Sequence, residues 1–192
     1  MHAAIESYVP QFAPRERTAR RVVCVWLLVV VVVLGYVGLI CAAPLLRARG
    51  YAVASAVLYS VFAPLCHQRP ERSFYLAGYP LAVCARCFGI YAGGALCLLL
   101  YPLVRSLAST TSVPARVWLV VAALPTAVDF TLGITGLWPN THLSRALTGA
   151  WLGAGLVCFV LPGLLAMGRS ARPLRSVSAT NTGVLSDNAR SA

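Results

Sequence analysis

Lysine is absent from this 192-residue chain, and acidic side chains number only five against sixteen arginines. Charged residues make up 11% of the sequence. Soluble domains carry roughly 25% charged residues, so the polar cover of this chain is short by more than half. The scarcity of charge therefore excludes an ordinary soluble domain.

The arginines also do not form the continuous basic stripe that nucleic-acid binding uses. They are scattered between apolar runs, which is where the orientation bias of membrane proteins places basic residues. The formal net charge of +11 therefore predicts no nucleic-acid partner. The distribution of the arginines favours a topology with both termini in the cytoplasm.

Hydrophobic residues make up 59% of the chain and gather in long runs of 18 to 23 residues. Such runs cross a hydrocarbon layer roughly 30 Å thick, whereas a shorter run of 15 residues, Tyr51–Leu65, suits a re-entrant or tilted helix. We therefore predict an all-α, multi-pass bundle in the cell membrane, with four long transmembrane helices plus one short helix. The lipid bilayer is its predicted partner, and the sequence identifies no protein or small-molecule partner. The four long runs are Val22–Ala43, Cys87–Val104, Val117–Trp138 and Ala146–Gly168.

Three segments follow from this pattern. Residues 1–21 form a basic N-terminal tail, and residues 22–168 form the membrane domain, with a Cys/His loop at 66–87. Residues 169–192 are rich in Ser, Arg and Asn and lack apolar periodicity, which predicts a disordered C-terminal tail.

Two G-x-x-x-G motifs lie inside the apolar runs. Gly89 and Gly93 form one, and Gly149 and Gly153 form the other. Small residues at this interval let helix backbones approach closely in a membrane. The motifs predict tight helix packing without identifying which helices are partners.

Three of the seven cysteines stand apart from the apolar interior. Cys24, Cys41, Cys97 and Cys158 lie in or at the edge of apolar runs, where cysteine behaves as a small hydrophobe. The remaining cysteines combine with a neighbouring histidine to give two close pairs separated by a loop, which is a ligand pattern of zinc sites. We predict a site for zinc or another transition metal with the ligands Cys66, His67, Cys84 and Cys87.

Other chemistry fits the same residues. Adjacent residues such as Cys66 and His67 rarely bind one ion without strain, so His142 is an alternative ligand. The C-x-x-C spacing of Cys84 and Cys87 is also that of thiol–disulfide exchange, in which Cys66 would take part. A third hypothesis is a structural zinc clip in a non-catalytic assembly or transport component. The pattern leaves open whether the protein is an enzyme.

A supporting polar site is predicted at the same membrane face. With four or with five crossings, the loop 66–87 and the loop 138–145 fall on one side, which brings Arg86, His142 and Arg145 together. Asp129 is the only acidic residue inside a long run, where a charge costs roughly 2.5–3.5 kcal/mol. It therefore requires a partner, for which Arg86 and Arg145 are candidates. Its role is either functional, as a ligand, proton carrier or substrate contact, or structural, as an Asp–Arg pair that fixes helix register.

The segments CHQRPERSF at 66–74 and CARCFGIYAG at 84–93 resemble a family of small multi-pass prokaryotic membrane proteins of unknown function. Asp129 and the R-x-x-T-G segment of Arg145, Thr148 and Gly149 match its later elements, although Phe130 stands where a glycine usually follows the aspartate. The resemblance covers roughly residues 53–155. It implies a membrane location and a metal or thiol site, and it supplies no reaction or substrate.

Overall fold

The computed structural model describes residues 13–107 and 115–170, and this part of the chain is mostly helical. Residues 1–12 of the predicted basic tail, and residues 171–192 of the predicted disordered tail, lie outside the described residues. The elements are α1 (Ala13–Ala48), α2 (Ala52–Phe62), the 3-10 turn η1 (Pro70–Arg72), β1 (Tyr75–Leu76), β2 (Tyr79–Pro80), α3 (Ala85–Val104), α4 (Val117–Thr135) and α5 (His142–Ser170).

The predicted fold class is confirmed. Within residues 13–107 and 115–170, four helices, α1, α3, α4 and α5, are long and apolar enough to cross a membrane, with mean hydropathy of 1.8 to 2.9 over their most apolar stretches. Each contains most of the run predicted for it, and α1 begins earlier, at Ala13, so the basic segment before the run is helical too. Helix α2 has 11 residues. At 1.5 Å per residue it is about 16 Å long, too short to cross the bilayer.

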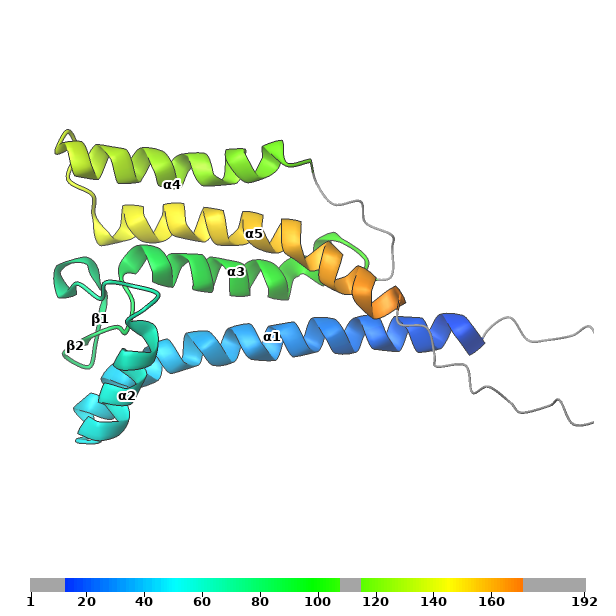
Figure 1. The fold of residues 1–192 in the computed structure, drawn as a ribbon, viewed down its shortest axis with the longest axis horizontal. Helices are drawn as coiled ribbons and strands as arrows, with labels where there is room; N and C mark the ends of the chain where they lie inside the picture. Colours follow the sequence, from blue (N-terminus) through cyan, green and yellow to red (C-terminus); the bar gives the residue numbers. More distant parts are fainter. Residues whose placement is uncertain (1–12, 108–114, 171–192) are drawn as a thin grey trace, which may run out of the picture.

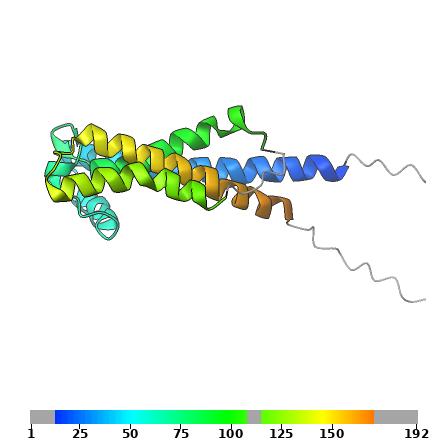
Figure 2. The same cartoon turned by 90° about the horizontal axis from the view of Figure 1, so that it is seen from above.

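The four long helices run roughly along one axis, and α5 lies between α3 and α4 (Figure 1). Helix α1 packs against α3 and α5, while α2, the strands β1 and β2, and the loop that follows α4 gather at one end (Figures 1 and 2). In the most apolar 18-residue stretch of α4 only 6% of the residues are buried inside the protein, and in that of α3 the share is 28%. Apolar side chains therefore cover most of the outer surface, and lipid is the solvent that suits them.

Helices α3 and α5 approach each other through both G-x-x-x-G motifs. A Cβ atom added at Gly89 or Gly93 would overlap the backbone of Ala146 or Ala150 on α5. A Cβ atom at Gly153 would in turn overlap the carbonyl of Ile90 on α3. The two motifs are thus reciprocal partners, and their close contact places the first turn of α3 beside the first turns of α5.

The segment between α2 and α3 folds back as a small hairpin that sequence reasoning did not predict. Strands β1 and β2 pair antiparallel around Ala77 and Gly78, which have φ values of 52° and 83°. Two positive φ values are the signature of a tight type I′ turn. Ser55 of α2 donates a hydrogen bond to the carbonyl of Ala43 on α1 (2.8 Å), and the Tyr59 hydroxyl donates to the carbonyl of Pro80. These bonds fix α2 and the hairpin to the end of α1.

Candidate metal centre

Three cysteine side chains converge where the loop after α2 meets the start of α3. Cys66 follows the last turn of α2, and its backbone N–H donates to the carbonyl of Phe62 (3.1 Å). Cys84 is the N-cap residue of α3, and Cys87 lies in the first turn of that helix. The backbone N–H of Cys84 donates to the Sγ of Cys66 at 3.2 Å, so the loop and the helix start are joined at the cysteines themselves.

The Sγ atoms of Cys66, Cys84 and Cys87 all lie within 4.8 Å of one another. Zinc binds thiolates at about 2.3 Å, which sets the sulfurs of a tetrahedral site about 3.8 Å apart. Movements of about 1 Å or less therefore bring the three sulfurs to the spacing of a bound ion. The cluster can hold a metal.

The Cys66 sulfur is surrounded by hydrogen-bond donors that stabilise a negative charge on it. The thiols of Cys84 and Cys87 hydrogen-bond to its sulfur and lower the pKa of Cys66 well below that of an ordinary thiol. Burial opposes this effect, and the backbone N–H groups of Cys84 and Gln68 reinforce it. A thiolate at Cys66 is both the nucleophilic and the metal-binding form of cysteine.

Gln68 positions the loop that carries Cys66, a role that sequence reasoning missed. Its backbone adopts a positive φ of 48°, which is uncommon for a residue other than glycine. Its side-chain amide donates to the carbonyls of Tyr59 (2.7 Å) and Ala82 (2.8 Å), which bridges α2 to the segment before Cys84. Gln68 stands in the CHQ segment directly after Cys66 and His67. A search for metal-ligating residue types passes over glutamine, so this residue was not singled out.

The two predicted histidines lie at different places. His67 is exposed and lines the same cavity of about 440 Å³ as the three cysteines, but its ring is not within the 4.8 Å cluster. His142 lies at the start of α5, where its Nε2 hydrogen-bonds to the carbonyl of Glu71 (3.1 Å) and its ring packs on Phe74. His142 therefore ties the η1 turn to α5.

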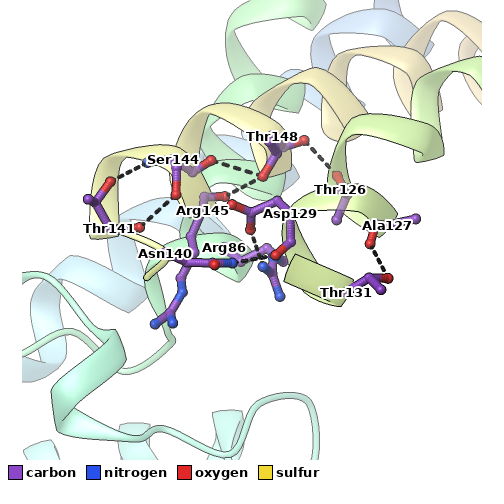
Figure 3. A network of polar contacts seen from close by, with 10 residues as sticks. All are labelled: Arg86, Thr126, Ala127, Asp129, Thr131, Asn140, Thr141, Ser144, Arg145 and Thr148. Carbon is purple, nitrogen blue, oxygen red and sulfur yellow. Dashed lines mark hydrogen bonds and ion pairs between the residues drawn. The ribbon is translucent and has the colours of Figure 1, made fainter. Parts of the chain in front are cut away.

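Asp129 has the arginine partner that its depth in the helix requires. The guanidinium of Arg86 pairs with Asp129 Oδ2, and the two side chains are 19% and 11% exposed. The Asn140 amide donates to the backbone carbonyl of Asp129, and the face of Arg86 lies over the ring of Phe130, 5.3 Å from its centroid. Of the two candidate partners, Arg86 forms the ion pair and Arg145 does not. In Figure 3 the guanidinium of Arg145 extends away from this pair.

Comparison with known proteins matches residues 66–159 to the sequence profile of DUF2085, described as a predicted membrane protein. An uncharacterized protein of Methanocaldococcus jannaschii, MJ1492, is 40% identical over 108 residues, which cover 56% of this chain and 69% of the relative. An uncharacterized protein of Methanothermobacter thermautotrophicus is 34% identical over 95 residues, 50% of this chain and 83% of the relative. The chain belongs to the DUF2085 family. No solved structure matches it.

The DUF2085 match begins at Cys66 and ends within α5. It therefore includes the three clustered cysteines and the Arg86–Asp129 pair, and it leaves α1 and α2 outside. Membership identifies a multi-pass membrane protein. The chemistry of the site has to be argued from its own residues.

Proposed function

We propose that this membrane protein binds one zinc ion, or another transition metal, through the thiolates of Cys66, Cys84 and Cys87, with His67 as the fourth ligand. The observation that carries the proposal is the mutual approach of three thiol sulfurs to within 4.8 Å. Three thiolates and one imidazole are a ligand set that zinc uses in tetrahedral sites.

The surroundings of the cluster support metal binding. The side chain of Gln68 holds the loop that carries Cys66, and the N–H of Cys84 donates to the Cys66 sulfur, so this ligand is already oriented. The exposed His67 side chain borders the same cavity as the three sulfurs, so an imidazole ligand is available at its edge. An ion bound there would link the end of α2 to the start of α3.

Elemental analysis and cobalt substitution of the detergent-purified protein test the proposal. We expect close to one metal ion per chain, and Co²⁺ in its place should give the absorption of a tetrahedral thiolate site. Cys66→Ser, Cys84→Ser and Cys87→Ser should each lose the metal. Cys24→Ser is the matched control, because Cys24 is exposed on α1, away from the cluster, and this variant should retain it.

His67→Ala examines the fourth position separately. If His67 is a ligand, this variant binds Co²⁺ more weakly and its absorption shifts toward that of a site with a water ligand. An unchanged cobalt spectrum in His67→Ala removes His67 from the ligand set and leaves an open position. Absence of metal from the wild type and from reconstituted protein would overturn the proposal.

Thiol–disulfide exchange is the second candidate, favoured by the C-x-x-C spacing of Cys84 and Cys87 and by the contact of Cys66 Sγ with the N–H of Cys84. In that reaction the Cys66 thiolate attacks one sulfur of a Cys84–Cys87 disulfide, forms a bond to it and releases the other cysteine as a thiolate. Thiol counting before and after reduction distinguishes the two candidates. Metal-free protein whose Cys84→Ser/Cys87→Ser variant yields two fewer thiols on reduction supports exchange, whereas metal-loaded protein with reduced thiols supports the metal site.

A further inference from the structure

A second, smaller cavity lies beside the cysteine cluster, between η1, α3, α4 and α5. Its volume is about 80 Å³, and three of its eight lining residues are arginines, Arg72, Arg86 and Arg145. Cys84 and Phe130 line it as well, and both also line the larger cavity of the cysteines. The two cavities are therefore neighbours at the same end of the bundle.

The positive charge of this cavity is not balanced by the protein around it. Among the described residues no carboxylate lines it, and Asp129, which forms an ion pair with Arg86, is not one of its lining residues. Neither Arg72 nor Arg145 lies within ion-pair distance of a carboxylate in residues 13–107 and 115–170. The Nε of Arg86 is buried and has no hydrogen-bond partner in the same part of the chain. Arg86 and Arg145 are partly buried beside the exposed Arg72, and like charges held close together repel one another without a counter-charge.

We propose that this cavity binds a phosphate group. Guanidinium groups present rigid forks of N–H donors that match phosphate oxygens in pairs. Two arginines free of ion pairs offer two such forks, and a phosphate group with three terminal oxygens can accept from both. A carboxylate has only two oxygens, which a single fork occupies.

The size of the cavity agrees with a small anionic group. Its volume of about 80 Å³ is two to three times the roughly 30 Å³ that one water molecule occupies in the liquid. It is well below the roughly 300–1,000 Å³ of pockets that enclose drug-sized ligands. The cavity therefore suits the phosphate group itself, with any remainder of the ligand outside it.

Two sources supply this chemistry. The cavity lies at the first turns of α3 and α5, where a membrane-spanning bundle meets lipid head groups, so both a lipid phosphate and a free phosphate can reach it. None of the three arginines is a proposed metal ligand. The anion site therefore goes beyond the proposed metal binding and does not depend on it.

Equilibrium dialysis of the full chain in neutral detergent, with inorganic phosphate as the probe, tests the proposal. We expect saturable binding of one phosphate per chain. Arg72→Gln and Arg145→Gln should each weaken it by at least about tenfold, or 1.4 kcal/mol. Arg49→Gln is the matched control, because Arg49 is exposed at the same end of the bundle but outside the cavity. Cys24→Ser, the control of the metal experiment, should also leave phosphate binding intact, because Cys24 is exposed on α1 and does not line this cavity.

Nanodiscs with and without phosphatidic acid distinguish the lipid source. Thermal stabilisation by phosphatidic acid that Arg72→Gln and Arg145→Gln abolish supports a lipid phosphate, and binding of inorganic phosphate with the same dependence supports a free one. Arg145→Lys, which keeps the charge but not the fork, should stay folded by size-exclusion chromatography and bind with intermediate strength. Failure of both probes to bind, equal binding by the glutamine variants, or displacement of phosphate by equimolar acetate would overturn the proposal.

Discussion

The guanidinium of Arg86, at the start of α3, forms an ion pair with Oδ2 of Asp129, near the end of α4. Helix α4 packs mainly on α5, so this pair is its polar link to α3. Thr126 adds a link to α5 by donating to the carbonyl of Thr148 (2.8 Å), as Figure 3 shows. The position of α4 therefore depends on polar groups, because its apolar surface is largely turned outward.

Removing one partner of this pair should destabilise the protein strongly. Asp129→Asn leaves the guanidinium of Arg86 without a counter-charge, and breaking a buried pair in this way costs about 3 kcal/mol. The free energy of unfolding in mixed detergent micelles measures the loss. The double variant Arg86→Met/Asp129→Leu removes both charges and should recover at least half of it. Equal stability of the double variant and Asp129→Asn would contradict this account.

The reciprocal glycine contact makes Gly153→Ala a sharp test of the packing between α3 and α5. The new Cβ would overlap the carbonyl of Ile90, and the helices must separate to accept it. We expect a loss of about 1–3 kcal/mol. Gly163→Ala is the control in the same helix, since no atom lies within 4 Å of a Cβ built there, and it should be neutral or slightly stabilising. Similar melting temperatures for the two variants would refute close packing at Gly153.

Gln68→Glu should weaken both the fold and the proposed metal site. The substitution removes the amide donor and turns a carboxylate toward the carbonyls of Tyr59 and Ala82. These hydrogen bonds are partly buried, and leaving their carbonyls unpaired costs about 1 kcal/mol or more. Chelator competition should show faster metal loss, and thermal melting should show the lost stability. Gln68→Met has a similar shape without the carboxylate and should be intermediate. A Gln68→Glu protein that retains both properties would exclude Gln68 as the residue that positions the loop.

The stability that Tyr59 gives to the contact between α2 and β2 should fall at alkaline pH. Burial raises the pKa of Tyr59 above its ordinary value of 10.0, and nearby Arg47 opposes the rise. The protonated phenol is thus the stabilising form. Its contribution is complete below the pKa of an unfolded tyrosine and is lost as the pH rises through the raised pKa of the folded protein.

Tyr59→Phe removes the hydrogen bond to Pro80 and should cost about 1 kcal/mol at neutral pH. The difference from the wild type should narrow as the pH is raised above 10, which denaturant unfolding at pH 8, 10 and 11 measures. Tyr75→Phe, at an exposed tyrosine of the hairpin, should change stability little at any of these pH values. A difference for Tyr59→Phe that does not vary with pH would show that the phenol does not titrate in this range.

The helices were predictable because each one corresponds to a long apolar run. The length and composition of such a run can be recognised without knowledge of any other part of the chain. The runs from Cys87 and Val117 end up as α3 and α4 with nearly the predicted boundaries. The hairpin was not predictable in this way, since its strands are two residues long and its turn uses Ala77 at a positive φ. Strands this short carry no periodicity to read.

The candidate site was predictable in part, because topology alone requires its loops to share one face. The sequence identified Cys66, Cys84 and Cys87, which the fold brings together, and it required a partner for Asp129. The choice of Arg86 over Arg145 depended on the rotation of α3 about its axis, which the glycine contacts with α5 determine. The placement of Arg72 beside Arg145 depended on the η1 turn, which has no counterpart in the apolar pattern.

The order of the helices along the chain has a consequence for biosynthesis. The carboxylate of Asp129 makes α4 expensive to transfer into lipid by itself, by about 2.5–3.5 kcal/mol on insertion scales. Helix α3 precedes α4 and leaves the ribosome first. Arg86, the ion-pair partner of Asp129, is therefore synthesised and reaches the membrane before Asp129 does. The positive charge of Arg86 is thus present before the carboxylate of Asp129 is inserted, and α4 can enter the bilayer with Asp129 already paired.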